Sequence, residues 1–288
     1  MRVRKAVIVA AGLGTRMLPA TRVIPKEILP VVDRPAIQVV VEEAVASGIE
    51  EIVIVVSPGR SIVLDHFAPV PDLERHLLAR SKHELLEVVR SISGIARITR
   101  AEQAEPLGLG HAVLQARAAV GDEPFAVMLP DDIFDADPPC LRQLLEVAEA
   151  REGPVVALMR VARAELSKYG IVEAEPAGPR LYRLTGMVEK PEPHNAPSDF
   201  AIVGRYVLTP EIFGILADGQ PGTGGEIQLT DGLLALSRRR AMYGYEFAGT
   251  RYDLGDRLGL ITAQIGFGLK RPDLAARLRD YLQTVVSA

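Results

Sequence analysis

The sequence is poor in cysteine, in aromatic residues and in net charge. Cys140 is the single cysteine among 288 residues, so the chain can form neither an internal disulfide bond nor a zinc site built from cysteines. This is typical of a reducing compartment, and we expect a cytoplasmic protein. The formal net charge is -4 and there is no basic tract, so we expect neither nucleic acid nor an anionic membrane surface as a partner.

Long hydrophobic runs are also missing. Gly12 and Gly14 interrupt the apolar stretch after the basic N-terminus before it reaches the form of a signal-peptide core. No segment approaches the roughly 20 apolar residues that a membrane-spanning helix needs. We therefore expect neither a secretory signal nor a membrane anchor.

Strand patterns alternate with helical patterns through the first half of the chain. Nearly continuous apolar runs predict buried strands at residues 6–9, 52–56, 95–99, 125–129 and 155–159. Apolar residues at helical spacing predict helices at residues 37–45, 73–92, 111–119 and 141–150. This alternation predicts an α/β fold with a Rossmann-like, mostly parallel mixed sheet flanked by helices.

The pattern changes after residue 160. Strand-like segments lie at residues 170–175, 181–189 and 201–208, and helical patterns return at residues 210–216, 229–240, 256–267 and 274–286. We predict an α/β core at residues 1–160, an α+β extension of the same domain at residues 161–255, and C-terminal helices at residues 256–288. These last helices are expected to form a cap or an oligomer contact.

A glycine turn follows the first predicted strand. In open α/β sheets this loop is a usual place for phosphate or nucleotide contacts, and Gly12 and Gly14 allow close approach of backbone N–H groups. The turn lacks the third glycine of a dinucleotide fingerprint and the Gly-Lys-Ser/Thr ending of a P-loop. Arg16, Arg22 and Lys26 follow and could supply charge-assisted donors to a polyphosphate. A tight turn with solvated basic residues is the alternative.

Two carboxylates follow the strand predicted at residues 125–129. In the run LPDD, Asp131 and Asp132 stand at the sheet edge where ligands are expected. Mg²⁺ is commonly bound by one or two carboxylates together with phosphate oxygens and water, so one aspartate suffices chemically. The alternative is an N-cap of a following helix.

Gln103 and the pair Glu189-Lys190 are further candidates. Gln103 offers a donor and an acceptor that could pair with a pyrimidine edge, or it is an ordinary surface glutamine. Glu189 and Lys190 end a predicted strand. Successive strand side chains point to opposite faces, so we expect no mutual salt bridge between the two. A solvated strand end is the alternative for this pair.

A series of sequence blocks resembles the sugar-phosphate nucleotidylyltransferase family, and within it the bacterial UTP:glucose-1-phosphate uridylyltransferases. The blocks are AAGLGTRMLPATRVIPKEILPVVDRPAIQ near the N-terminus, then GLGHAV, LPDD, YGIV, VEKP, AIVGRYVL and GGEIQLTD. They occur in the family's order and cover most of the chain, roughly residues 5–267. Several long blocks in order are more specific than any single short motif.

The resemblance implies a reaction of UTP with α-D-glucose 1-phosphate that gives UDP-glucose and pyrophosphate. It implies a Mg²⁺ ion held by Asp131, with Asp253 in RYDLGD as a second metal-facing carboxylate. It assigns Arg16 and Lys26 to the α-phosphate and the leaving pyrophosphate, and Lys190 to the sugar phosphate. A homodimer or homotetramer is expected, as is common in this family.

The resemblance also implies binding residues. The residues expected to bind the nucleotide are Ala11, Gly12, Gly14, Glu27, Gln103 and Gly108. The residues expected to bind the sugar are Gly170, Glu189, Gly204 and Glu226, with a role of Glu226 near a helix start as an alternative. The chain departs from the family where Arg22 replaces a common Lys and where Leu107 replaces a Lys found in some members.

Three alternatives stay open at this point. The first is the same chemistry with another nucleotide, as in a glucose-1-phosphate thymidylyltransferase or another nucleotide-sugar pyrophosphorylase. The second is a glycosyltransferase that consumes a nucleotide sugar and releases UDP. The third is a non-catalytic nucleotide-sugar sensor, which should have lost phosphate or metal ligands, whereas Lys26, Asp131 and Lys190 are all present.

Overall fold

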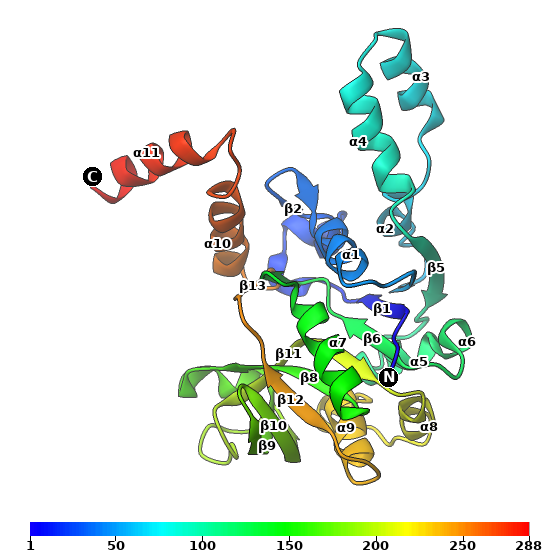
Figure 1. Cartoon of the computed structure of the whole chain (residues 1–288), viewed down its shortest axis with the longest axis vertical. Coiled ribbons are helices and arrows are strands. Elements are labelled where there is room, and N and C mark those ends of the chain that lie inside the picture. The colour runs from blue at the N-terminus through cyan, green and yellow to red at the C-terminus, as the bar shows by residue number, and fades with distance from the viewer. Residues whose placement is uncertain (288) are drawn as a thin grey trace.

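The computed structural model describes residues 1–287, apart from the side chain of Thr223, and centres on one large sheet (Figure 1). Within this part, nine strands lie in the order β5-β4-β1-β6-β11-β8-β12-β10-β9. They are β1 (Lys5–Ala10), β4 (Glu51–Val56), β5 (Arg97–Glu102), β6 (Phe125–Met128), β8 (Val155–Arg160), β9 (Gly170–Gly178), β10 (Leu181–Glu189), β11 (Phe200–Leu208) and β12 (Tyr243–Glu246). The predicted α/β fold with a mixed sheet is confirmed.

The two halves of the sheet differ in strand direction. The pairs β1–β4, β1–β6 and β4–β5 are parallel, as the strand and helix alternation predicts. In the other half, β11 runs antiparallel to both β6 and β8, and β9 and β10 form an antiparallel pair. Because β11 lies between β6 and β8, the predicted extension shares one sheet with the predicted core.

Strand β5 corrects one prediction. The sequence predicts a buried strand at residues 95–99, whereas β5 begins at Arg97 and lies at the sheet edge. Its exposed side chains include Arg97, Arg100 and Glu102. Charged side chains on an edge strand prevent pairing with other chains, so the edge position and the composition agree.

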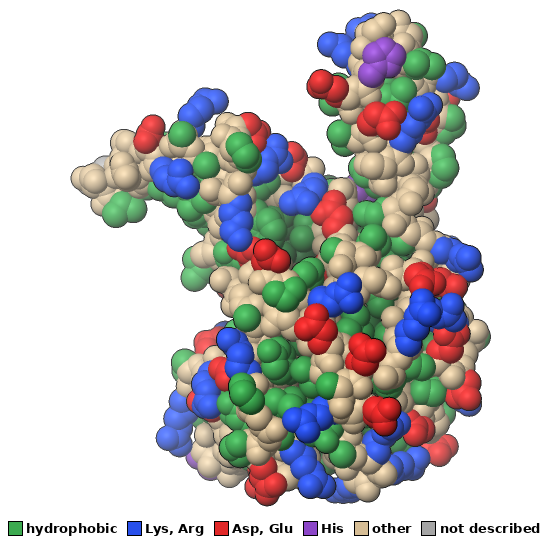
Figure 2. Space-filling model, viewed as in Figure 1, with side chains coloured by type: hydrophobic (Ala, Val, Ile, Leu, Met, Phe, Trp, Pro, Cys, Tyr) green, Lys and Arg blue, Asp and Glu red, His purple; other side chains and the backbone are tan. Residues whose placement is uncertain are grey.

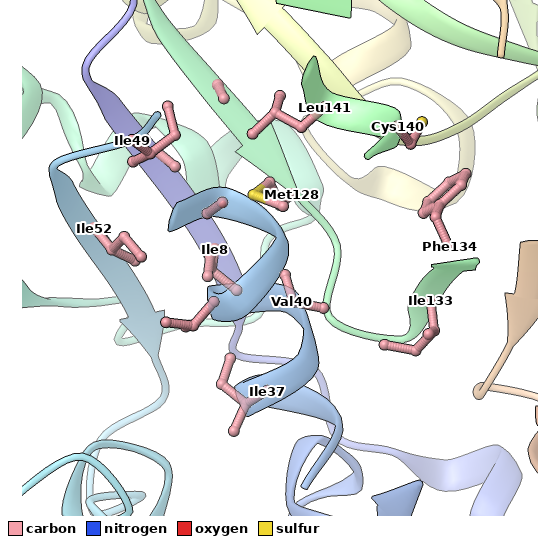
Figure 3. Packing of buried hydrophobic residues seen from close by; sticks show 14 of the residues in the cluster. Ile8, Ile37, Val40, Ile49, Ile52, Met128, Ile133, Phe134, Cys140 and Leu141 are labelled. Carbon is pink, nitrogen blue, oxygen red and sulfur yellow. The ribbon is translucent and has the colours of Figure 1, made fainter. Parts of the chain in front are cut away.

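Helices cover both faces of the sheet. Alternate residues of β1 belong to two different cores: Ile8 packs with α1 (Ala36–Ala46) and α7 (Cys140–Arg151), and Val7 with α5 (Leu109–Gln115), α8 (Glu211–Ala217) and α9 (Leu229–Ser237). Figure 3 shows the first core, where Ile37 and Val40 of α1 pack over β1. The apolar period of residues 37–45 thus faces the sheet, as predicted.

Two predicted helices are each divided. The pattern at residues 73–92 forms α3 (Pro71–Ala79) and α4 (His83–Ser93), because Ser81 between them has a left-handed φ of 54°. The pattern at residues 111–119 likewise forms α5 and the short α6 (Arg117–Val120). Figure 1 shows α3 and α4 as a hairpin that projects from the body next to α2 (Ile62–Asp65).

The predicted C-terminal helices are present as α10 (Arg257–Gly268) and α11 (Ala275–Val286). The N-cap residue Asp256 accepts a hydrogen bond from the backbone N of Gly259. In Figure 2, α11 and the α3/α4 hairpin both project from the upper end of the molecule, α11 at the left and the hairpin at the right. Across residues 1–287, no helix combines the length and the apolar character that a membrane crossing requires.

Short elements complete the fold and carry much of the site. Small strands form two further sheets, β2 (Pro30–Val31) with β3 (Arg34–Pro35) and β7 (Asp132–Asp135) with β13 (Thr250–Asp253). The 3₁₀ turns are η1 (Thr15–Met17), η2 (Ala20–Arg22), η3 (Lys26–Ile28), η4 (Arg163–Lys168) and η5 (Thr223–Gly225). The pairing of β7 with β13 brings the LPDD run beside the RYDLGD run.

Candidate active site

Two adjoining pockets open at the carboxyl ends of β1 and β6. The glycine-turn pocket has a volume of about 370 Å³, and the second, here the Glu189 pocket, has about 320 Å³. Leu109, Leu129, Asp131 and Glu226 line both pockets. Because the walls are shared, ligands in the two pockets would meet at Asp131.

The pockets gather most of the predicted site residues. The predicted residues that line the glycine-turn pocket are Ala11, Gly12, Gly14, Lys26, Gln103, Gly108, Asp131 and Glu226. The predicted residues that line the Glu189 pocket are Arg16, Asp131, Gly170, Glu189, Lys190, Gly204, Glu226 and Asp253. Arg22 is exposed on η2 and lines neither pocket, whereas Lys26 lines the glycine-turn pocket and Arg16 the Glu189 pocket.

The glycine turn depends on Gly14 more than on Gly12. Gly14 has a left-handed φ of 68°, and its carbonyl accepts a hydrogen bond from Thr21 Oγ1 at 2.6 Å. A Cβ atom at Gly14 would also press on the Thr21 side chain at 3.3 Å, whereas one at Gly12 would make an ordinary contact with Lys26. The glycine turn is therefore held in a defined conformation and is not merely a tight turn with solvated basic residues.

Lys26 and Asp131 form an ion pair on the wall of the glycine-turn pocket. Lys26 Nζ lies 2.5 Å from Asp131 Oδ2, and both side chains are mostly buried. Burial lowers the pKa of Lys26, but the carboxylates of Asp131 and Glu27 outweigh it and raise the pKa above its usual value. Burial raises the pKa of Asp131, but the Lys26 cation outweighs it and holds the pKa below its usual value. Both groups are therefore charged at neutral pH.

Gln103 is held in a fixed orientation rather than exposed as a surface glutamine. It is 5% exposed, its Nε2 donates to the Gly108 carbonyl at 3.1 Å, and the same Nε2 lies 3.0 Å from His111 Nδ1. Gly108 has a φ of 105°, and a Cβ atom there would collide with Glu226 and Ile227. His111 therefore serves to orient Gln103, and the site needs glycine at residue 108.

Glu27 lies in the protein interior. Its side chain is 1% exposed, it does not line the glycine-turn pocket, and neither carboxylate oxygen has a hydrogen-bond partner among the described residues. Burial raises the pKa of Glu27 to about 7, and the nearby Lys26 cation offsets part of this effect. The role of Glu27 in nucleotide binding stays a prediction, and its side chain in η3 is buried.

The Glu189 pocket is shaped by a close approach between β9 and α9. Glu189 Oε2 accepts a hydrogen bond from Thr230 Oγ1 at 2.7 Å. A Cβ atom at Gly170 would lie 2.8 Å from the same hydroxyl, so glycine is required for this approach. The alternative of a solvated strand end is excluded for Glu189, whose side chain is 11% exposed.

The expected separation of Glu189 and Lys190 is wrong. Their side chains form a salt bridge, with Lys190 Nζ 3.4 Å from Glu189 Oε1. The strand alternation ends at Glu189, and Lys190 has a left-handed φ of 44°, which turns its side chain back toward its neighbour. Lys190 remains half exposed and lines the pocket.

Arg251 is a site residue that sequence reasoning missed. Its Nε donates to Asp132 Oδ1 at 2.7 Å, and its terminal nitrogens reach Asp253 Oδ2 at 3.2 Å and the Tyr169 hydroxyl at 3.1 Å. Burial raises the pKa of Asp132 to about 6, although Arg251 offsets part of the effect. Asp132 is thus engaged in a buried ion pair with Arg251, and it lies in β7 rather than at a helix N-cap. The signal was present, since Arg251 stands two residues before Asp253.

The described residues hold no cluster of three or more His, Cys, Asp or Glu side chains that could bind a metal without other ligands. Asp253 is already engaged through Arg251 and through the backbone N of Gly255, which donates to its Oδ1 at 2.9 Å. Asp131 lines both pockets. A metal at Asp131 would therefore need oxygen ligands from a substrate, which is the usual situation for Mg²⁺ on phosphates.

Comparison with known proteins decides the family. The family model described as nucleotidyl transferase matches residues 5–266. The chain belongs to the nucleotidyl transferase family. Among curated members, the UTP–glucose-1-phosphate uridylyltransferase of Bacillus subtilis (strain 168) is 46% identical over 286 residues, which cover 99% of this chain and 98% of the relative. Uridylyltransferase 1 of Streptococcus pyogenes serotype M1 is 45% identical, with 98% of this chain and 94% of the relative covered.

Solved structures of the same family share the fold. A UDP-glucose pyrophosphorylase complexed with UDP-glucose has a TM-score of 0.86 and 39% identity, and covers 94% of this chain and 100% of that chain. A UTP-bound UGPase from Acinetobacter baumannii has a TM-score of 0.89 and 34% identity, with 98% and 99% covered. The resemblance seen in the sequence blocks is confirmed.

Proposed function

We propose that the chain transfers a uridylyl group from UTP to α-D-glucose 1-phosphate and so makes UDP-glucose and pyrophosphate. One observation carries the proposal: two adjoining pockets, one beside the glycine turn and one beside Glu189, share Asp131 in their wall. The curated relatives carry the name of this activity and match nearly the whole chain. A nucleotide in the first pocket and a sugar phosphate in the second would place their phosphates side by side.

The glycine-turn pocket would seat UTP. Ala11, Gly12 and Gly14 would present backbone to the nucleotide, and the uracil edge would face Gln103 and the backbone at Gly108. Gln103 supports this assignment because its orientation is fixed, so its amide does not have to be ordered when the base binds. Glu27 is left out of this set because it lies in the interior.

The Glu189 pocket would seat the sugar phosphate. Glu189 would accept hydrogen bonds from sugar hydroxyls, and Thr230 would hold its carboxylate in place. Gly170 and Gly204 would allow the ring to approach the backbone, and Glu226 lines the boundary with the nucleotide. Lys190 would bind the attacking phosphate from the rim.

The chemical difficulty is charge repulsion rather than nucleophilicity. A phosphate monoester oxygen can attack the α-phosphorus of UTP in line without a general base, and pyrophosphate then leaves. Two like charges ~4 Å apart repel by about 4 kcal/mol at an effective dielectric of 20, and the reactants carry several such pairs. Arg16 and Lys26 would offset charge on the α-phosphate and the leaving group, and Lys190 would do so on the attacking phosphate.

A Mg²⁺ ion fits the donor set at the shared wall. Asp131 is a hard oxygen donor and stays ionised at neutral pH, and Asp253 is a second carboxylate of the Glu189 pocket. A bound Mg²⁺ would neutralise phosphate charge and orient the triphosphate. Lys26 would then exchange its partner Asp131 for phosphate oxygens.

A homodimer or homotetramer is part of the proposal. Helices α10 and α11 expose large apolar side chains, namely Leu258, Ile261, Tyr281, Val285 and Val286. Exposed apolar groups on a projecting element favour contact with another chain. The single buried Cys140 agrees with the cytoplasmic location expected from the sequence.

A panel of substrates tests the activity. UTP, dTTP, ATP and GTP are combined with glucose 1-phosphate or galactose 1-phosphate, with and without Mg²⁺, and pyrophosphate release is measured. The proposal expects UTP with glucose 1-phosphate to give the highest kcat/KM, and the rate to vanish without Mg²⁺. A preference for dTTP would indicate a thymidylyltransferase. Release of UDP from UDP-glucose, measured separately, would indicate a glycosyltransferase. Substrate binding without any turnover would indicate a sensor.

A further inference from the structure

Arg205 in β11 carries a fully buried guanidinium group. Arg205 lines neither pocket, but its hydrogen bonds reach the backbone of residues that do. Its Nε and one terminal nitrogen donate to the two carboxylate oxygens of Glu43 in α1, at 3.1 and 2.6 Å. The remaining donors reach the backbone carbonyls of Leu129 at 3.1 Å, Gly204 at 3.0 Å and Asp132 at 3.0 Å. All five N–H groups of the guanidinium are thereby used.

The carbonyls that Arg205 binds frame Asp131. Leu129 and Asp132 are the residues on either side of the turn that carries Asp131, and the backbone N of Asp132 donates to the Leu129 carbonyl at 3.2 Å. The Asp131 carbonyl accepts from the backbone N of Leu254 at 2.7 Å. The backbone on both sides of Asp131 is thus held by hydrogen bonds from Arg205 and from Leu254, the residue after β13. This backbone sets the position of the Asp131 side chain.

The same guanidinium fixes Gly204, which lines the Glu189 pocket. The pairing of β11 with β8 is irregular between Ile202 and Tyr206, so β8 does not hold Gly204 in place there. The Gly204 carbonyl also accepts from the backbone N of Leu129 at 2.9 Å. One side chain therefore links the wall of each pocket to the other.

A contribution to stability alone does not account for this arrangement. Removing two charges from water is costly, and buried ion pairs can often be replaced by apolar residues without loss of stability. Phe134, whose ring centroid lies 4.6 Å from the Arg205 guanidinium carbon, already offers apolar surface for such a replacement. What an apolar pair would lack is a set of donors directed at three carbonyls.

We propose that Arg205, oriented by Glu43, is a positioning residue of the reaction. It fixes the orientation of the Asp131 side chain and the position of the Gly204 backbone. This rests on the proposed function, because Asp131 is taken as the metal carboxylate. Lysine cannot replace arginine in this role, since one ammonium group cannot reach Glu43 and the carbonyls of Leu129 and Asp132 in the same fork.

The test compares three variants. Arg205→Met/Glu43→Leu replaces the pair by apolar residues, and Arg205→Lys keeps both charges but loses the guanidinium donors. Leu236→Ala is the control, since Leu236 is buried in the core on the other face of the sheet. For each we measure the melting temperature, kcat, the KM of each substrate, the Mg²⁺ concentration at half-maximal rate, and binding of Mg-UTP by calorimetry.

We expect both Arg205 variants to lower kcat at least 10-fold, to raise the Mg²⁺ midpoint at least 10-fold and to weaken Mg-UTP binding, at a melting temperature no lower than that of the control. We expect Leu236→Ala to lower the melting temperature while kcat and the Mg²⁺ midpoint stay within twofold of the unsubstituted protein.

Unchanged kcat, Mg²⁺ midpoint and Mg-UTP binding in either folded Arg205 variant would overturn the proposal. So would a control that shows the same losses. If the double variant does not fold, Arg205→Lys decides on the same criteria. An unsubstituted protein that makes no UDP-glucose would refute the proposed function instead, and the calorimetric comparison of Mg-UTP binding would still decide the role of Arg205.

Discussion

Lys26 Nζ and Asp131 Oδ2 lie 2.5 Å apart on the wall of the glycine-turn pocket, and Asp131 also lines the Glu189 pocket. The cation proposed for the phosphates and the carboxylate proposed for the metal therefore neutralise each other when no substrate is bound. Under the proposed function, bound Mg-UTP would offer each a stronger partner, the metal for Asp131 and phosphate oxygens for Lys26. Such an exchange would spare the protein an unpaired buried charge in either state.

Asp131→Asn removes the negative charge but keeps the shape of the side chain. We expect kcat to fall by at least about 100-fold and the dependence on Mg²⁺ concentration to be lost, because the amide binds divalent cations poorly. Steady-state kinetics over a Mg²⁺ series measure both. Asp135→Asn in β7 is the matched control, since the Asp135 carboxylate pairs with Lys270 outside the pockets. Full turnover of Asp131→Asn would contradict the assignment.

Lys190→Ala should affect the sugar phosphate and spare the nucleotide. Lys190 lies at the rim of the Glu189 pocket, so we expect a loss of rate on the order of 100- to 1,000-fold with the Kd of UTP changed by less than about twofold. Rates and calorimetric UTP binding are compared with Lys82→Ala, an exposed lysine in the α3/α4 hairpin. Near-normal turnover would count against a role for Lys190.

The sequence predicted the strands that are buried on both faces, because such strands are continuous runs of apolar residues. Strands β1, β4, β6 and β8 are almost continuous apolar runs, so their existence followed from the local sequence pattern. Strand β5 carries Arg97, Arg100 and Glu102, and an edge strand of this kind has no buried pattern to recognise. The break between α3 and α4 depends on one left-handed residue, Ser81, which no apolar period reveals.

The site was predicted where a motif places a residue at the end of a strand, and missed where two distant segments meet. Asp131 follows β6 and Glu189 ends β10, and both line the Glu189 pocket. Thr230 and Arg251 become site residues because α9 approaches Glu189 and because β13 pairs with β7, and neither contact is encoded by local pattern. Glu27 was assigned by resemblance alone, and its side chain lies in the protein interior.

Thr230→Val tests the hydrogen bond that orients Glu189. Replacing the hydroxyl by a methyl group removes a hydrogen bond to a carboxylate, a loss of about 1.5 kcal/mol or more, so we expect kcat/KM for glucose 1-phosphate to fall roughly 10-fold or more. The KM of UTP should change by less than about twofold. Thr262→Val in α10 is the control, because that hydroxyl donates to the Gly259 carbonyl outside the pockets. Equal effects on both substrates would argue against this role.

Glu27 makes stability depend on pH. Its pKa is raised from 4.5 to about 7 by burial, so between these values the unfolded chain releases a proton that the folded chain keeps. The free energy of unfolding therefore falls as pH rises through this window, by about 3 kcal/mol in all.

Glu27→Gln removes that titration. Urea unfolding of both proteins should show the variant more stable by about 3 kcal/mol at pH 8 relative to the difference found at pH 4.5. The comparison between the two proteins cancels the titration of other groups. A difference in stability that is the same at both pH values would show that Glu27 titrates normally.

The central claim is that the sugar phosphate oxygen attacks the α-phosphorus of UTP in the shared cleft. Glucose 1-phosphate carrying oxygen-18 in its three non-bridging phosphate oxygens tests it most directly, with the products analysed by mass spectrometry after turnover with Mg-UTP. The account predicts UDP-glucose that retains all the label and pyrophosphate that carries none. Label in pyrophosphate, or turnover that yields UDP in place of UDP-glucose, would contradict it.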